Sequence, residues 1–308
     1  MSKITVVAYQ DCLPKNNNNP EKLQALQKFC NGVRAFGDSA IVMPGNNLVD
    51  CDVAVILGWV HNNSKNSTHL NLRKRVVESQ LAKGQRVVII DSNLFLYKNT
   101  ANPHHYLRYS FDGVFPNTGI YCDTAPTQLN WDRLAAKMQL EIKPYRKTGN
   151  HLLICLQRHG GWSMGGAPVM VWVKDMLTSI RQYSDRPIVL RPHPGDKTNH
   201  DFSALLKQFA NVSVSNSTTS LIDDLNNCWA VINHNSSPAV AAAIEGVPVF
   251  LTDPANSQCR EIANTDFSLL ENPTMPERHA WLNRLAMFHW SFDDLDHGRC
   301  WQHMRKYL

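Results

Sequence analysis

The stretch "WAVINHNSSPAVAAAIEGVPVFL", residues 229–251, indicates the fold of this chain. Short apolar runs at 229–233 and 247–251 enclose a helical segment rich in small residues at 236–245. Continuous apolar runs of this length are typical of strands covered on both faces, and strand, helix and strand in succession predict parallel pairing. We therefore expect one unit of a parallel α/β sheet here.

The same alternation extends over the rest of the sequence. Further short, branched apolar runs predict strands at 4–9, 40–44, 53–59, 86–91, 151–157, 187–192 and 212–215. Helices are predicted at 20–37, 68–84, 168–183, 201–209 and 219–226. The predicted fold class is α/β, with two Rossmann-like domains.

The domain boundary is predicted in the basic, polar segment 145–150, which precedes the first strand of the second half. The predicted domains are 1–147 and 148–308. The tryptophan-rich segment 276–308 is expected to be a helical tail of the second domain, docked through its aromatic side chains. The asparagine-rich loop 15–20 follows the first strand, and is either a substrate lid or a plain surface loop.

Composition narrows the class of protein. The chain has 308 residues, 43% of them hydrophobic, which is enough for two cores. No apolar run approaches the roughly 18 to 20 residues that span a bilayer, and the N-terminus lacks a secretory signal, so we expect a cytoplasmic protein with no membrane partner. The eight cysteines are widely spaced, which predicts neither a metal site nor a disulfide framework. The net charge of +5 is compatible with an anionic partner such as a nucleotide or nucleic acid.

Three predicted strands of the second half end in polar or glycine-rich loops. Carboxyl ends of parallel strands meet at one edge of a sheet, where helix N-termini and free amides favour anions. Together these loops predict a site for a phosphate-bearing ligand. The candidate residues for binding this ligand are Gln157, Arg158, Gly161, Arg191, His193, His234, Asn235, Ser236 and Ser237.

Two of these loops also have simpler interpretations. In "RPHPGD", residues 191–196, the prolines restrict the backbone, which predicts a rigid anion clamp; the alternative is an ordinary polar turn. Ser236 and Ser237 are expected to cap a helix with Pro238 in its first turn, and such a cap is common in helices that bind nothing.

The pairing of Arg-Pro-His-Pro with a later H-N-S-S-x-x-x-x-A-x-x-x-G-x-P-V resembles the C-terminal half of GT-B glycosyltransferases, notably the capsule, Kdo and sialyl types that carry an HP motif. The resemblance covers about 157–253. It implies two Rossmann-like domains facing across a cleft, the first binding the acceptor and the second a nucleotide-sugar. It also implies that His193, Ser236 and Ser237 contact the donor phosphates, with Arg191 and Gln157–Arg158 nearby.

Two further segments, "YLRYSFDGVFPNTGIY" (106–121) and "LICLQRHGGWSMGG" (153–166), resemble glycosyltransferases encoded by tailed phages. This resemblance implies that the acceptor is 5-hydroxymethylpyrimidine, such as hydroxymethylcytosine, in double-stranded phage DNA. The basic clusters at 72–75 and 304–307 are the candidate contacts with DNA, or else ordinary solvated helix faces.

Glycosyl transfer needs stabilisation of the leaving diphosphate and, when it inverts configuration, a base for the acceptor hydroxyl. No D-x-D motif stands at a strand end, so we expect no metal and no cofactor besides the nucleotide-sugar itself, which could be a UDP-sugar. The catalytic candidates are His193, Asp11 and Asp112. Asp112 resembles the acidic residue before glycine in HP-type sialyltransferases, with a turn-capping aspartate as the alternative; Asp11 has the alternative of an ordinary loop residue.

Other functions fit the same fold. The acceptor could instead be a bacterial capsule or surface glycan. A sugar-nucleotide epimerase would need two carboxylates near the donor sugar, and Glu245 with Asp253 is the available pair. A nucleotide-binding module without catalysis is the remaining alternative.

Overall fold

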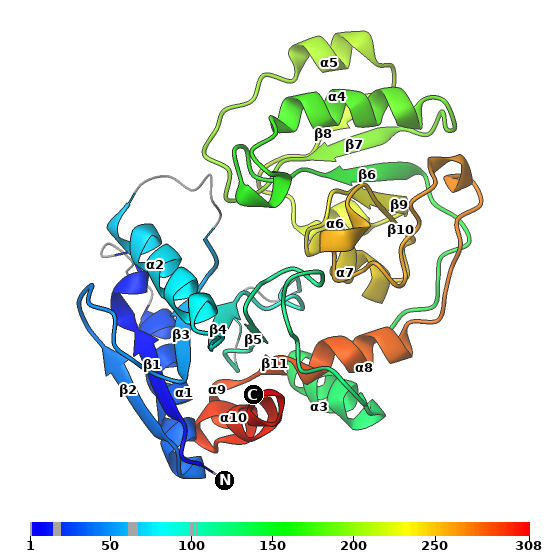
Figure 1. Ribbon diagram of the computed structural model, residues 1–308. Coiled ribbons are helices and arrows are strands. Elements are labelled where there is room, and N and C mark those ends of the chain that lie inside the picture. The colour runs from blue at the N-terminus through cyan, green and yellow to red at the C-terminus, as the bar shows by residue number, and fades with distance from the viewer. Residues whose placement is uncertain (1, 15–19, 61–66, 99–101, 103) are drawn as a thin grey trace. The chain divides into compact units, whose positions relative to one another are not determined.

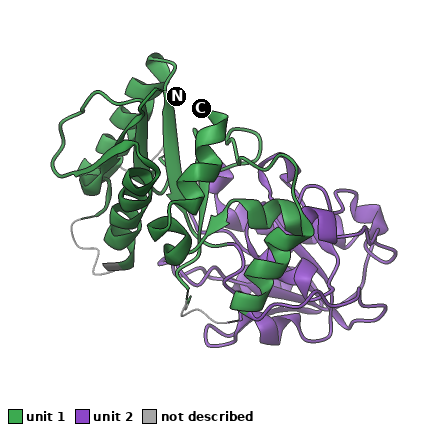
Figure 2. Cartoon of the chain, turned by 90° about the horizontal axis from the view of Figure 1, so that it is seen from below, with its two compact units in different colours: residues 1–93, 101–138, 282–308 green, residues 94–100, 139–281 purple. Residues whose placement is uncertain are grey.

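The computed structural model describes residues 2–14, 20–60, 67–98, 102 and 104–308 (Figure 1). The loop expected at 15–20 therefore lies almost entirely outside the described residues. The chain forms two compact units, shown in different colours in Figure 2. Unit 1 comprises residues 1–93, 101–138 and 282–308, and unit 2 comprises 94–100 and 139–281.

The sheet of unit 1 contains six strands within the described residues, in the order β11-β5-β4-β3-β1-β2. These strands are β1 (Thr5–Tyr9), β2 (Ser39–Met43), β3 (Val53–Leu57), β4 (Arg86–Asp91), β5 (Leu107–Phe111) and β11 (His289–Trp290). β1 to β4 pair in parallel, whereas β5 runs antiparallel to β4, and β11 runs antiparallel to β5. The four strands predicted in this half are confirmed, and β5 and β11 are additional.

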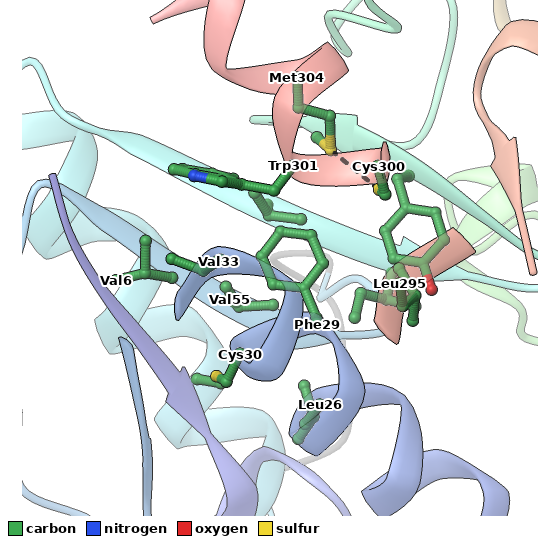
Figure 3. Close-up of a cluster of buried hydrophobic side chains, with 14 of the residues drawn as sticks. Val6, Leu26, Phe29, Cys30, Val33, Val55, Leu295, Cys300, Trp301 and Met304 are labelled. Atoms are coloured by element: carbon green, nitrogen blue, oxygen red, sulfur yellow. Dashed lines mark hydrogen bonds between the residues drawn. The ribbon is translucent and has the colours of Figure 1, made fainter. Parts of the chain in front are cut away.

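Helices α1 (Pro20–Phe36) and α2 (Thr68–Ala82) connect the parallel strands of unit 1. α1 buries Leu26, Phe29 and Val33 at helical spacing, which is the apolar stripe that predicted it. Figure 3 shows this stripe packed against Val6 and Val55 of the sheet. α3 (Gln128–Met138) adds a further helix to this unit.

Most of the C-terminal segment, residues 282–308, belongs to unit 1 and not to the second domain, which corrects the predicted domains 1–147 and 148–308. The division between the units falls at 138/139 and again inside α8 (His279–Met287). Helices α9 (Phe292–Asp296) and α10 (Arg299–Met304) and the 3₁₀ turn η5 (Arg305–Tyr307) follow. The physical reason is packing: Trp301 is 1% exposed, lies edge-on to Phe29 with ring centroids 5.9 Å apart, and donates a hydrogen bond to Asp38 (2.8 Å).

The described residues of unit 2 form a five-stranded, all-parallel sheet in the order β10-β9-β6-β7-β8. Its strands are β6 (His151–Cys155), β7 (Ile188–Arg191), β8 (Val212–Val214), β9 (Cys228–Asn233) and β10 (Val249–Leu251). Its helices are α4 (Val169–Ile180), α5 (Ser203–Gln208), α6 (Leu221–Leu225) and α7 (Pro238–Ile244). Every strand and helix predicted in this half is present within a few residues of its predicted ends, so the α/β prediction is confirmed.

Each sheet has a point where the strand order reverses. In unit 2 the chain runs from β6 to β7 and β8, then returns to place β9 on the other side of β6. In unit 1 it runs from β1 to β2, then returns to place β3 on the other side of β1. Loops diverge at such a switch point, and ligands of open α/β sheets bind there, beside the carboxyl ends of the strands.

The assignment of the tail to unit 1 predicts the effect of Trp301→Ala. Removing this buried indole should lower the free energy of unfolding of unit 1 by about 3–5 kcal/mol. Peptide-resolved hydrogen exchange should show faster exchange in β1 and β5, with β6 and β7 of unit 2 much less affected. Val171→Ala, at a 57% exposed position of α4, is the control. Loss of protection confined to unit 2 would contradict the assignment.

Candidate functional site

The loops after β6 and β9 are joined directly at the switch point of unit 2. Cys155 at the end of β6 pairs in register with Asn233 at the end of β9. Beyond these residues, the buried Gln157 amide donates a hydrogen bond to Asn235 Oδ1 (2.6 Å). The structure therefore brings these two predicted site residues together, where their side chains fix the distance between the two loops.

Asn235 and His234 are held by the loop after β10. Asn235 Nδ2 donates to Asp253 Oδ2 (2.8 Å) and to the carbonyl oxygen of Ser163 (3.1 Å). His234 Nδ1 lies 2.7 Å from Thr252 Oγ1, and its Nε2 lies 3.6 Å from Asp253. Burial lowers the pKa of His234, although the Asp253 carboxylate opposes that shift. His234 is therefore neutral at pH 7, and Asp253 carries the negative charge of this cluster.

His193 and Arg158 form the cationic side of the site. Gly195 N–H donates to His193 Nδ1 (2.9 Å), so the neutral ring carries its proton on Nε2. Burial, and then the Arg158 guanidinium, lower the pKa of His193. Arg158 is exposed and forms no ion pair with any described residue. A neutral imidazole with one N–H donor thus lies near an unneutralised guanidinium, a combination suited to an anion.

Asp196 organises the "RPHPGD" loop. Its carboxylate accepts hydrogen bonds from the His159 amide (2.9 Å), the Thr198 amide (2.9 Å) and His200 Nε2 (3.1 Å). Burial opposes the charged form, but these bonds outweigh it and hold the pKa of Asp196 far below its usual range. The loop after β7 is thereby tied to the loop after β6, which explains how His193 and Arg158 are kept near each other.

Arg191, a predicted donor-binding residue, is committed elsewhere. Its guanidinium forms an ion pair with Asp224 of α6 and donates to the carbonyl oxygen of Thr219 (3.0 Å). Ser215 Oγ also donates to Asp224, at 2.7 Å. The reason is strand periodicity, because Leu190 faces the buried core and its neighbour Arg191 must point to the opposite face. This geometry gives Arg191 a structural role.

The start of α7 differs from the expected cap. Ser237 occupies the N-cap position, but its side chain makes no capping hydrogen bond. It is exposed, so its hydroxyl is available to a ligand. Ser236 Oγ is enclosed and has no hydrogen-bond partner among the described residues. Gly161 lies in a turn in which a Cβ would meet the Arg158 carbonyl oxygen at 2.8 Å, so the loop after β6 needs a glycine there.

Glu245 and Asp253, the carboxylate pair considered for an epimerase, lie at opposite ends of the unit 2 strands: Glu245 at the amino ends and Asp253 at the carboxyl ends. Glu245 follows the C-terminus of α7, is 2% exposed, and forms ion pairs with Lys98 (3.2 Å) and Lys143. Burial opposes ionisation, but the two lysines outweigh it and lower the pKa of Glu245. Asp253 follows β10 at the carboxyl edge. The pair therefore cannot act on one sugar, and the buried carboxylate of Glu245 is occupied by the two lysines.

In unit 1, the two candidate bases are placed very differently. Asp11 lies in η1 (Gln10–Cys12), directly after β1 at the carboxyl edge, and its carboxylate accepts from the Gly45 amide (2.6 Å). Asp112 lies at the amino edge because β5 runs antiparallel to β4. Its carboxylate pairs with Arg86 (2.6 Å) and accepts from the Val87 amide (2.9 Å). The geometry supports the turn-forming alternative for Asp112 and leaves Asp11 as the candidate base.

Sequence reasoning missed several residues that the structure places at these edges. Thr252 and Trp172 contact His234, and His200 contacts Asp196. Their only sequence signal is position: Thr252 follows a strand, and His200 follows Asp196 by four residues. In unit 1, Arg73 of the basic cluster 72–75 is buried and not part of a solvated face.

Two features are absent from the described residues. No group of three or more His, Cys, Asp or Glu side chains there could hold a metal ion. None of the described helices combines the length and the apolar character needed to cross a membrane. The expected independence from metals and the expected location in the cytoplasm remain predictions.

The arrangement around Asp196 predicts the effect of Asp196→Asn. Loss of the charge should lower the free energy of unfolding by about 1–3 kcal/mol, because two amides and His200 lose a charged acceptor. Since the pKa is depressed in the folded state, this contribution is complete above about pH 4 and is lost as the pH falls further. Urea unfolding at several pH values should therefore show a flatter acid dependence in the variant. Asp201→Asn, on the fully exposed part of the same loop, is the control, and an equal effect there would contradict the assignment.

Comparison with known proteins bears on the fold alone. No protein-family model and no curated protein match this sequence. Two similar solved structures are chains of Thermosulfurimonas dismutans KpsC. The β-Kdo 2,7-transferase has a TM-score of 0.54 at 13% identity, covering 97% of this chain and 98% of its own. The β-Kdo 2,4-transferase has a TM-score of 0.56 at 13% identity, covering 94% and 93%.

A Methanocaldococcus jannaschii UDP-GlcNAc 2-epimerase in complex with UDP-GlcNAc and UDP is also similar, with full coverage of both chains, 10% identity and a TM-score of 0.37. The similarity to the two transferases extends over nearly the whole length of each chain. Together with the mostly parallel sheet of unit 1 and the parallel sheet of unit 2, it shows that this chain has two Rossmann-like domains, a fold of the GT-B type.

Proposed function

We propose that the protein is a glycosyltransferase that moves a sugar from a nucleotide-sugar to a hydroxyl group of an acceptor. The observation that carries this proposal is the pair of His193 and Arg158 at the carboxyl edge of unit 2, where nothing among the described residues neutralises the guanidinium. A cation and an N–H donor that lie close together are suited to stabilise a departing nucleoside diphosphate.

Each part of the unit 2 site has a role in this proposal. The Arg158 guanidinium balances the charge that develops on the leaving diphosphate, and His193 Nε2–H donates to a phosphate oxygen. The exposed Ser237 hydroxyl and the glycine-rich loop around Gly161 add further donors. Asp253, with Asn235 and His234, provides hydrogen-bonding groups for sugar or ribose hydroxyls. Uridine is one candidate for the base, and the donor sugar is left open.

Asp11 is the proposed general base. It lies at the carboxyl edge of unit 1, where a ligand of that unit would bind, and it accepts one amide hydrogen bond that orients the carboxylate. A carboxylate in this position would take the proton of the acceptor hydroxyl as the sugar–phosphate bond breaks. Because Asp112 is paired with Arg86 at the other edge, we do not assign it this role.

We propose that the acceptor is a glycan and not hydroxymethylcytosine in duplex DNA. Both basic clusters that could have contacted DNA are largely occupied: Arg73 is buried, and Arg305 is paired with Asp38 (2.6 Å). Arg75 donates to the Asn46 carbonyl oxygen (3.1 Å). Duplex binding depends on several cations that face the phosphates together, and these residues do not form such a stripe.

The donor site predicts reduced nucleotide affinity in His193→Ala and Arg158→Gln. Each substitution removes one hydrogen bond to a charged phosphate oxygen, donated by the His193 ring or by the Arg158 guanidinium. The Kd for UDP or another nucleoside diphosphate should therefore rise about 10- to 100-fold. Isothermal titration across a panel of nucleotides and nucleotide-sugars measures this. Lys174→Gln, which removes an exposed cation from α4 of the same unit, is the control. Unchanged affinity in both site variants would refute the proposed donor site.

The assignment of Asp11 as the base predicts that Asp11→Asn loses turnover and that Asp112→Asn keeps it. Loss of a general base should reduce transfer by about 10²- to 10⁴-fold with little change in donor Kd. Asp112→Asn should keep turnover per folded molecule and lose about 1–3 kcal/mol of stability, since it breaks only the contacts with Arg86 and Val87. The asparagine tolerates the positive φ of 65° at this position, so the change isolates the charge.

The acceptor is identified by mass spectrometry of candidate acceptors incubated with a panel of nucleotide-sugars. A mass gain on oligosaccharides supports the glycan acceptor, whereas a mass gain on hydroxymethylcytosine duplex alone would overturn it. A changed donor sugar released without any acceptor would identify an epimerase. Nucleotide binding without turnover under any condition would identify a binding module.

A further inference from the structure

Arg73 is a buried guanidinium at the switch point of unit 1. Its Nε donates to the carbonyl oxygen of Cys12 (2.9 Å), in the chain leaving β1, and its Nη1 donates to that of Trp59 (3.3 Å), in the chain leaving β3. These two strands are the neighbours between which the strand order reverses. The residue is only 9% exposed. A cation is thus fixed at the place where the topology of this sheet favours a ligand.

The charge of Arg73 is not balanced by a carboxylate. It forms no ion pair with any described residue, and the remaining segments (1, 15–19, 61–66, 99–101 and 103) contain no Asp or Glu. The nearby acids are already engaged: Asp91 pairs with Arg108, and Asp11 accepts from the Gly45 amide. Burial lowers the pKa of the guanidinium, and the opposing effects of Cys12 and then Asp91 do not offset it. A buried, uncompensated cation is costly to the fold, which calls for a reason to keep it.

The guanidinium also has unused donors. Arginine carries five N–H groups, and the two carbonyl oxygens account for two of them. Nη2 has no partner within the described part of the chain, yet it is not among the enclosed unpartnered atoms, so it remains reachable from solvent. Gly58 makes room beside it: the backbone there has φ +79°, and a Cβ would lie 2.9 Å from Nη1.

His69 lies one helical turn before Arg73 on α2. Burial, and then the Arg73 charge, lower the pKa of His69, so its ring is neutral at pH 7. Its Nδ1 lies 3.3 Å from Ser67 Oγ. This neighbour adds hydrogen-bonding capacity without adding a negative charge that could satisfy Arg73.

We propose that Arg73 binds a small anionic substituent of the acceptor, a carboxylate or a phosphate monoester. The Cys12 and Trp59 carbonyl oxygens hold the guanidinium in place for this contact. The inference rests on the proposed transferase function, because it names the acceptor class of that enzyme. The low exposure of Arg73 favours a group that protrudes from a glycan over a duplex phosphodiester, whose bulky backbone cannot reach a recessed guanidinium. Asp11, adjacent to Cys12 in sequence, then lies beside the bound acceptor.

The test uses the full chain and binding probes that need no donor. Methyl glucuronide and inorganic phosphate represent the two anion sources, and methyl glucoside is the neutral counterpart. Either or both anions should bind the parent protein, and Arg73→Gln should weaken that binding about 10- to 100-fold. Arg73→Lys should recover part of the affinity, since it keeps the charge and loses the planar fork. Arg75→Gln, on the same helix with the same change of charge, should bind as the parent does.

Peptide-resolved hydrogen exchange on the parent protein locates the site even if Arg73 variants fail to fold. Bound anion should slow exchange in 10–14, 57–60 and the first turns of α2. Equal binding of the neutral glycoside, unchanged affinity in a folded Arg73→Gln, or protection confined to unit 2 would each overturn the proposal. Slower hydrogen exchange of these segments with a short DNA duplex than with methyl glucuronide would also overturn the proposal. These binding experiments contain no nucleotide-sugar. A failure of the proposed transferase function, seen as absent donor binding or absent turnover, would therefore not change their outcome, and the two proposals can fail separately.

Discussion

The candidate site depends on the parallel pairing of β6 with both of its neighbours. Cys155 pairs in register with Arg191 on one side and with Asn233 on the other, so all three loops leave the sheet at the same level. Side chains then fix those loops: Gln157 with Asn235, and Asp196 with His159. Had any strand run the other way, its loop would lie at the far edge, as Asp112 does in unit 1.

Much of the fold could be predicted from the sequence, because buried parallel strands have short apolar runs and the helices that cover them have apolar residues at helical spacing. The runs at 151–157 and 229–233 therefore gave nearly correct boundaries. The tail was misassigned for the opposite reason. Its aromatic residues signal burial, but they do not specify which unit they contact, and the partner Phe29 lies far away in the sequence.

The candidate site was predictable in location and less so in detail. Strand ends identified His193, Arg158 and Asn235, since position after a strand is a property of the sequence. The orientation of Arg191 was not, because its partner Asp224 comes from a helix 33 positions later in the chain. Arg73 was hidden for a similar reason: the cluster "LRKR" looks solvated until the helix is docked, and the carbonyl oxygens that bind the guanidinium belong to other elements.

The docking of the tail has a consequence for the order of folding during synthesis. Every strand of unit 2 has been made once residue 251 leaves the ribosome, whereas unit 1 must wait for β11 and for Trp301 before its sheet and core are complete. Unit 1 is thus a discontinuous unit: its strands β1 to β5 are made first, and the sheet keeps an open edge at β5 while unit 2 emerges. Nascent chains stalled before residue 289 would expose β5 as an open edge, the kind of surface that chaperones and other strands recognise.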